Sequence, residues 1–161
     1  MIVKLPTATD TREFGRQLAA WLRAGDLVIL DGPLGAGKTA LAQGIGAGLG
    51  VLGEVTSPTF VIARVHRPAP GGRGLPLVHV DAYRLGSLAE VDDLDLDTGL
   101  DEAVTVVEWG EGKVERLADA HLTVRLQRHD DDSRTAVLSG VGADWPERLQ
   151  ALQGAIAVGR V

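Results

Sequence analysis

Cysteine is absent from the 161-residue sequence, and aromatic residues make up only 4% of it. Without thiols the chain can form neither disulfides nor thiolate-bound metal sites, as is usual in a reducing compartment. The sequence also has no apolar run of membrane-spanning length. Its first residues, Met1–Pro6, lack the basic segment and long apolar run of a signal peptide. We therefore expect a cytoplasmic protein that does not associate with membranes.

Positive charge is also scarce: 16 lysines and arginines stand against 22 aspartates and glutamates, a net charge of -6. Such a chain has no overall positive field to hold a polyanion, so direct binding to nucleic acid is not expected. An acidic run over residues 90–102 is typical of a solvated surface, and a docking surface for a basic partner is the alternative. The length suits one domain, which we expect to span residues 1–161.

The most informative stretch is Leu27–Leu41. In it Gly32, Gly37, Lys38 and Thr39 complete the pattern Gly-x-x-x-x-Gly-Lys-Ser/Thr, after an apolar run and before a helix-compatible segment. This order predicts a strand, a phosphate-binding loop and a helix. The glycines let successive backbone N–H groups turn inward around an anion, and the helix start adds its positive dipole end. We expect Lys38 to contact the β and γ phosphates of a nucleotide, and the Thr39 hydroxyl to contact Mg²⁺.

The remaining patterns predict an α/β fold, namely a three-layer sandwich of the P-loop NTPase type with a mixed sheet and an antiparallel hairpin at its edge. In the first helix, Asp10 and Glu13 have the spacing of a capping box, and Gly25 is the expected stop. Glycines interrupt the helix after the loop, which favours close packing against the sheet over a helix end that loosens with nucleotide state. Further elements are expected at 1–5, 40–50, 61–66, 77–83, 87–94, 104–109, 113–119, 121–127, 135–138 and from about residue 144.

Two carboxylates follow apolar runs, as in a Walker-B element. Asp81 ends one predicted strand and Glu108 another, and ligands of open α/β sheets collect beyond the carboxyl ends of the strands. Either residue could hold Mg²⁺ through water. The alternative is that one of them is a structural partner of Arg84 or Lys38.

Four blocks occur in the order and approximate spacing of the TsaE (YjeE) family: Gly32–Thr39, Ser57–Phe60, His79–Leu85 and Val107–Trp109. Together with Thr11 and Gly15 in the first predicted helix, they make the whole chain resemble that family. The family is the bacterial ATPase component of the machinery that makes threonylcarbamoyladenosine beside the anticodon of tRNA. The resemblance implies slow ATP hydrolysis, action on a complex of TsaD and TsaB, and contact with tRNA only through those partners. It indicates no oligomeric state.

The resemblance and the loop pattern together imply the site residues. Catalytic roles are implied for Lys38, Asp81 and Glu108, and Mg²⁺ binding for Thr39, Asp81 and Glu108. Thr59 lies in a switch-like segment that would sense the γ-phosphate. The implied ATP-binding set is Gly32, Leu34, Gly35, Ala36, Gly37, Lys38, Thr39, Ala40, Thr59, Trp109 and Arg134.

The sequence departs from the family at two positions. Pro33 replaces an aspartate that the family usually has, which removes an N–H group and a carboxylate from the loop and leaves the rate of hydrolysis open. Gly110 replaces a frequent proline. There is no Asn-Lys-x-Asp and no Asp-x-x-Gly motif, which argues against a Ras-type GTPase.

Two other functions are compatible with a phosphate loop. A small-molecule kinase would need an arginine-bearing lid, for which Arg67–Arg73 is the only candidate. A nucleotide-dependent binding module would use the same loop without productive hydrolysis.

Overall fold

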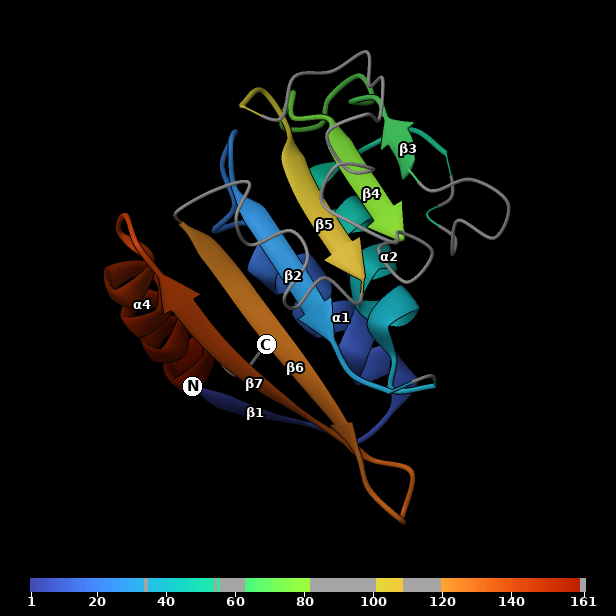
Figure 1. The fold of residues 1–161 in the computed structure, drawn as a ribbon, viewed down its shortest axis with the longest axis vertical. Coiled ribbons are helices and arrows are strands. Elements are labelled where there is room, and N and C mark those ends of the chain that lie inside the picture. The colour runs from blue at the N-terminus through green and yellow to red at the C-terminus, as the bar shows by residue number, and fades with distance from the viewer. Residues whose placement is uncertain (34, 54, 56–62, 82–100, 109–119, 160–161) are drawn as a thin grey trace.

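The computed structural model describes residues 1–33, 35–53, 55, 63–81, 101–108 and 120–159. In it, seven strands form one sheet in the order β1-β7-β6-β2-β5-β4-β3 (Figure 1). The strands are β1 Ile2–Leu5, β2 Leu27–Asp31, β3 Ala63–His66, β4 Leu77–Asp81, β5 Val104–Glu108, β6 His121–Arg128 and β7 Arg134–Val141. The described helices are α1 Ala8–Ala19, α2 Lys38–Leu49 and α4 Trp145–Gly159. None of these helices is long and apolar enough to cross a bilayer.

The sheet is mixed, as the sequence predicts. Strands β4, β5, β2 and β6 run parallel to one another, so their carboxyl ends meet at one edge of the sheet. The flanking strands β1, β7 and β3 are antiparallel to theirs. The predicted hairpins are β3 with β4 and β6 with β7. The predicted α/β class and the antiparallel hairpin edge are therefore confirmed.

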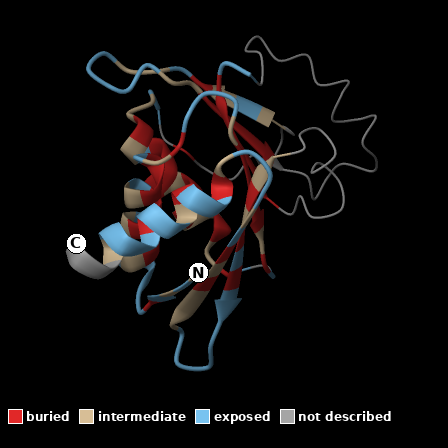
Figure 2. Ribbon diagram, turned by 90° about the vertical axis from the view of Figure 1, so that its left-hand side faces the viewer, coloured by how far each residue is buried: buried red, intermediate tan, exposed pale blue. Residues whose placement is uncertain are grey.

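The core lies on both sides of the central strands. Val28, Leu30 and Val106 are buried in a cluster with residues of α1, α2 and α4, which lie behind the sheet in Figure 1. Ile29 and Val107 are also buried, although alternation along a strand places them on the opposite face. Figure 2 shows that buried residues, in red, run along the strands of the sheet. Strands that are apolar on both faces are typical of the parallel centre of a sandwich.

Helices α1 and α2 pack unusually closely through glycines. A Cβ atom at Gly15 would lie 2.5 Å from the Leu41 carbonyl oxygen, and one at Gly48 would lie 2.6 Å from that of Arg16. At Gly44 an added Cβ would overlap the Arg12 carbonyl. The expected close approach of the glycine-rich helix is therefore made mainly with α1 rather than with the sheet, because these glycines face that helix.

The start of α1 differs from the prediction. Its capping box is formed by Thr7 and Asp10: Asp10 N–H donates to Thr7 Oγ1 over 3.2 Å, and Thr7 N–H donates to Asp10 Oδ2 over 2.9 Å. The prediction that Asp10 and Glu13 form the capping box is wrong. Asp10 is the third residue of the helix and pairs with Thr7, the residue before the helix. Glu13 instead accepts a hydrogen bond from Arg16 Nε at 2.9 Å. The helix ends at Ala19, before the expected stop at Gly25.

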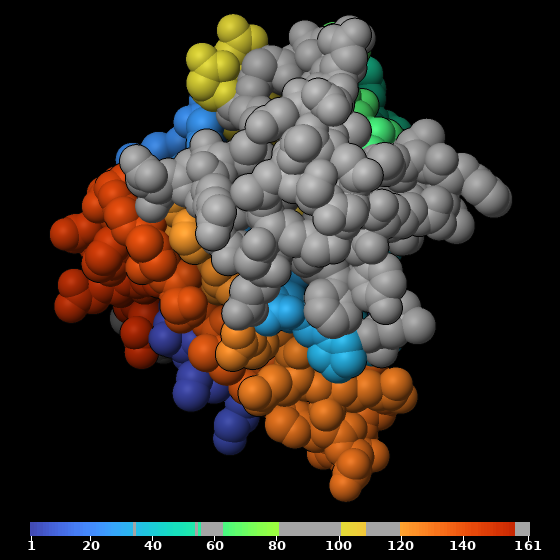
Figure 3. All heavy atoms as spheres, in the orientation of Figure 1, coloured from blue at the N-terminus to red at the C-terminus, as the bar shows by residue number. Residues whose placement is uncertain are grey.

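The β6–β7 hairpin extends beyond the predicted strand ends. Its turn projects past the end of β2, and in Figure 3 its orange atoms lie against the light-blue atoms of the loop that follows β2. The helix predicted from residue 40 begins two residues earlier, at Lys38. The helices expected at 87–94 and 113–119 lie outside the described residues.

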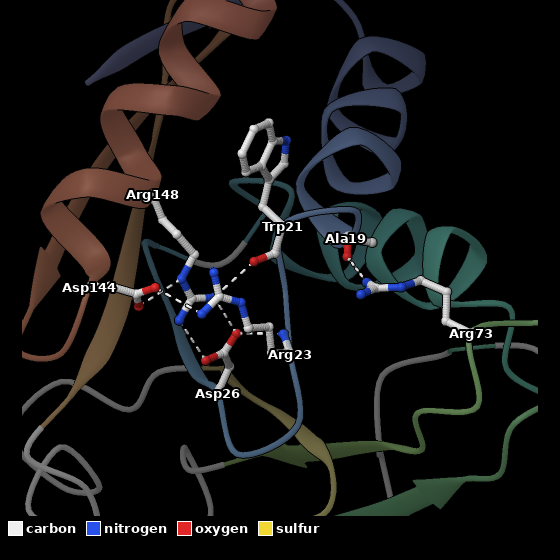
Figure 4. A network of polar contacts seen from close by, with 7 residues as sticks. All are labelled: Ala19, Trp21, Arg23, Asp26, Arg73, Asp144 and Arg148. Carbon is white, nitrogen blue, oxygen red and sulfur yellow. Dashed lines mark hydrogen bonds and ion pairs between the residues drawn. The ribbon is translucent and has the colours of Figure 1, made fainter.

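A buried arginine ties α4 to the segment between α1 and β2 (Figure 4). Arg148 Nη1 and Nη2 donate to the Asp26 carboxylate at 2.7 and 2.9 Å, and Nη1 also donates to the Trp21 carbonyl at 2.8 Å. The guanidinium carbon lies 3.8 Å from the centre of the Trp145 ring. The hydrogen bond and the charge of Asp26 raise the pKa of Arg148, although burial acts against them.

Candidate functional site

The phosphate loop joins β2 to α2 at the carboxyl edge of the sheet. Gly35 and Gly37 have φ values of 81° and 104°, in the left-handed region that side chains avoid. Gly37 caps α2, and within the described residues no side chain occupies that cap. The N–H groups of the first helical turn therefore point beyond the end of the helix, where they can bind an anion.

Lys38 lies folded over this loop. The side chain is buried, and its Nζ donates to the carbonyl oxygens of Gly32 and, over 3.4 Å, Pro33. Pro33 thus supplies a carbonyl group to the ammonium. Backbone contacts of this kind hold the Lys38 charge at the mouth of the loop, where a phosphate group would meet it.

Glu108 reaches the first turn of α2 from the neighbouring strand. The Thr39 hydroxyl donates to Glu108 Oε1 over 3.4 Å. Glu108 is the register partner of Leu30, one residue before the end of β2, so the end of β5 lies close to the loop and helix that follow β2. The pair provides a hydroxyl and a carboxylate oxygen next to the phosphate loop.

Asp81 ends β4 directly beside Glu108. The two residues are Cα partners in the parallel register. The last residues of two neighbouring strands therefore both carry carboxylates, at the edge from which the phosphate loop emerges.

Among the described residues, His79 is a contact of Glu108 that the sequence did not predict. Its Nε2–H donates to Glu108 Oε2, inside the protein. The signal in the sequence was its position two residues before Asp81, which places it on the same face of the strand. Lys38, one of the two structural partners considered for Asp81 or Glu108, contacts the loop carbonyls, and Arg84, the other, lies outside the described residues.

Arg134 reaches the phosphate loop from the β6–β7 hairpin. Its Nη2 donates to the Gly35 carbonyl at 3.1 Å. Arg128, its register partner across the hairpin, also approaches: Nη1 lies 3.6 Å from the position of a Cβ atom at Gly35. Hydrogen bonds from Arg128 and Arg134 hold the pKa of Asp132, in the turn between them, below its usual value. Two guanidinium groups of the hairpin therefore lie beside the loop at Gly35, and Arg128 was not predicted.

Most of the predicted site residues are gathered at this edge. The ones brought together are Gly32, Gly35, Ala36, Gly37, Lys38, Thr39, Ala40, Glu108 and Arg134, with the backbone of Asp81. The predicted residues Leu34, Thr59 and Trp109 lie outside the described part of the chain.

The chemistry of this edge fits a nucleoside triphosphate with Mg²⁺. Left-handed glycines, an open helix start, one ammonium and two guanidinium groups form a local anion site in a chain of net charge -6. Mg²⁺ prefers oxygen ligands and usually keeps water and phosphate oxygens, so a few protein ligands suffice. Thr39 and Glu108 offer such oxygens. Among the described residues no cluster of three or more histidine, aspartate or glutamate side chains forms a different metal site.

The lid candidate of the kinase hypothesis lies elsewhere. Ala69 N–H donates to the Gly50 carbonyl at 2.9 Å, and Arg73 N–H donates to that of Leu49 at 3.2 Å. Both contacts are at the carboxyl end of α2. A helix of 12 residues is about 18 Å long, so Arg67–Arg73 is at the far end of α2 from the phosphate loop.

Known proteins of one family resemble this chain. Residues 5–136 match the family model described as "Threonylcarbamoyl adenosine biosynthesis protein TsaE". A protein named tRNA threonylcarbamoyladenosine biosynthesis protein TsaE from Streptomyces coelicolor is 59% identical over 139 residues, 83% of this chain and 93% of its own. A protein of the same name from Bacillus subtilis is 36% identical over 138 residues, covering 83% and 81%.

A solved structure agrees. The crystal structure of Bacillus subtilis YdiB matches with a TM-score of 0.76 and 28% identity, over 95% of this chain and 93% of that one. The region matched by the family model includes the phosphate loop, Asp81, Glu108 and Arg134. The chain belongs to the TsaE family.

Proposed function

We propose that the protein is the ATP-binding and ATP-hydrolysing component of the machinery that makes threonylcarbamoyladenosine in tRNA. The family gives the pathway, because its members are named for this biosynthesis. The site supports the reaction. The observation that carries it is the Glu108 carboxylate, which lies 3.4 Å from the Thr39 hydroxyl at the start of the helix after the phosphate loop.

In this proposal the loop residues Gly32–Ala40 bind the phosphates of ATP through backbone N–H groups and the Lys38 ammonium. Thr39, Asp81 and Glu108 would hold Mg²⁺, which would neutralise charge on the phosphate oxygens. Arg134, already in contact with the loop, adds positive charge near the nucleotide. Thr59 and Trp109 complete the nucleotide contacts that the resemblance implies.

Phosphoryl transfer to water needs positioning and electrostatic stabilisation rather than covalent chemistry by the protein. Lys38 stabilises negative charge that develops on the phosphate, and the acidic strand ends orient the groups around it. In this proposal hydrolysis by the isolated protein is slow, and it becomes faster when partners complete the site.

We further propose that TsaD and TsaB are these partners, in the cytoplasm where tRNA is modified. The net charge of -6 supports indirect contact with tRNA, because an acidic protein gains little from binding a polyanion by itself.

The test is hydrolysis and tRNA modification by the Lys38→Ala variant, with purified partners present. We expect both activities to fall by about 100-fold or more, as when one charge-stabilising group is removed from an active site. Unchanged hydrolysis in this variant would contradict an active site at the phosphate loop. Transfer of the γ-phosphate to a small molecule rather than to water would instead support the kinase hypothesis.

A further inference from the structure

His79 is an unusual residue to find fully buried in a strand of the sheet. It lies in β4 with its side chain 0% exposed, between the apolar residues Val78 and Val80. Its register partner on β5 is Val106, two residues before Glu108. Alternation along parallel strands therefore places His79, Val106 and Glu108 on one face, the face that α2 covers.

The imidazole ring makes a single described hydrogen bond. Nε2–H donates to Glu108 Oε2, while Nδ1 has no hydrogen-bond partner among the described residues. A buried polar atom without a partner costs about 1–3 kcal/mol, and a leucine at this position would avoid that cost. Packing alone thus gives no reason for histidine here, and the contact with Glu108 does.

The two oxygens of Glu108 have different neighbours. Oε2 accepts the hydrogen bond from His79 on β4, and Oε1 faces the Thr39 hydroxyl on α2 at 3.4 Å. Two contacts from two different elements determine the plane of the carboxylate. Without His79, Oε2 would lack its buried donor, and the carboxylate could rotate away from Thr39.

We propose that His79 is a positioning residue for the nucleotide site: it holds Oε2 of Glu108 so that Oε1 faces Thr39 and the Mg²⁺-nucleotide. This inference rests on the proposed function, because it assigns Glu108 to that site. Residues that orient a metal-binding carboxylate typically affect activity or metal affinity by about 10- to 100-fold. Nucleotide binding by the phosphate loop itself does not need His79.

Three variants separate positioning from packing. His79→Leu fills the position with an apolar side chain and removes the donor, whereas His79→Gln keeps an N–H donor at a similar reach. His66→Leu is the matched control, since His66 is a buried histidine of the adjacent strand β3 whose ring contacts the Leu52 carbonyl instead. Two quantities are measured for each variant. The first is the rate of single-turnover ATP hydrolysis. The second is the Mg²⁺ concentration at which the affinity for a fluorescent non-hydrolysable ATP analogue has risen by half of its full increase.

We expect His79→Leu to slow hydrolysis and raise that Mg²⁺ concentration by about 10-fold or more. Its affinity for the analogue without Mg²⁺ should stay within about threefold of wild type. His79→Gln should recover most of the loss, and His66→Leu should behave as wild type. Equal behaviour of His79→Leu and wild type in both measurements overturns the proposal, and so does a failure of glutamine to rescue.

NMR of the wild-type protein gives a measurement that does not depend on the leucine variant folding. The Nε2–H signal of His79, assigned by its loss in His79→Gln, should shift when Mg²⁺ is added with the analogue, and not with the analogue alone. If the chemical shift of this signal does not change when Mg²⁺ is added with the analogue, the proposal is overturned. Failure of the proposed function would give a different result. The wild-type protein would then not hydrolyse ATP in a Lys38-dependent way. The Mg²⁺ titration and the NMR shift would still show whether His79 responds to Mg²⁺ bound with the analogue.

Discussion

The hydroxyl of Thr39 lies 3.4 Å from Oε1 of Glu108, although 69 positions separate the two residues in the sequence. The contact exists because β2 and β5 are parallel neighbours whose ends are in register. It brings together the two parts of the proposed phosphoryl-transfer site, namely a phosphate loop and an acidic strand end.

Replacing Glu108 by alanine should separate nucleotide binding from hydrolysis. We expect hydrolysis to fall by about 100-fold, because an acidic group at the reacting centre is lost, while the phosphate loop still binds ATP. Affinity for a non-hydrolysable analogue and single-turnover hydrolysis measure the two effects. If tRNA modification survives the loss of hydrolysis, the protein acts as a nucleotide-dependent binding module.

Two helical glycines, one in the contact between α1 and α2 and one outside it, should respond oppositely to replacement by alanine. Gly44→Ala should destabilise the protein, by about 1–3 kcal/mol, because the methyl group overlaps the Arg12 carbonyl. Gly154→Ala in α4 meets nothing within 4 Å and should stabilise the protein by about 0.5–1 kcal/mol through helix propensity. Urea unfolding measures both. Equal effects of the two changes would contradict the close helix contact.

Arg148→Ala should cost about 3–5 kcal/mol of unfolding free energy, because it leaves the Asp26 carboxylate buried without its partner. The Arg148 and Asp26 side chains are only 8% and 10% exposed. Arg23→Ala is the matched control, since Arg23 pairs with Asp144 while 61% exposed. That pair should contribute at most about 1 kcal/mol. Similar losses in both variants would argue against a special role of the buried pair.

Stability should depend on the protonation of His66. Burial lowers the pKa of this side chain, although its hydrogen bond with the Leu52 carbonyl acts in the opposite direction. The folded protein therefore binds fewer protons than the unfolded chain, so stability is full above the unfolded pKa of about 6.5 and falls as the pH drops through it.

Urea unfolding near pH 7.5 and near pH 5.5 tests this, since the interval spans the unfolded pKa of about 6.5. The His66→Leu variant should lose less stability over that interval than wild type. An identical loss in both proteins would show that His66 does not contribute to the pH dependence.

Local patterns predicted much of this fold. The phosphate-loop pattern between an apolar run and a helical segment located β2 and α2, because each residue of the pattern has a conformational reason. Alternating residues located both hairpins. The capping box of α1 was misplaced by one turn, because Thr7 and Asp10 fit the same spacing rule as Asp10 and Glu13. Such local rules can match at more than one position.

The remaining features depend on contacts between distant segments. Gly44 faces α1 only because the two helices cross at that point, and the sequence alone favoured an approach to the sheet. His79 meets Glu108 only through the register of β4 with β5. Arg128 reaches the loop because the hairpin extends past the end of β2. Contacts between distant segments cannot be predicted from the spacing of residues within one segment.

The most direct test of the central claim is ATP hydrolysis by the purified protein, with and without the TsaD–TsaB pair, scored beside threonylcarbamoyladenosine formation in tRNA. The account predicts slow hydrolysis alone, faster hydrolysis with the pair, and loss of both hydrolysis and modification in Lys38→Ala. Hydrolysis that is indifferent to the pair, or modification that proceeds in full with Lys38→Ala, would contradict it.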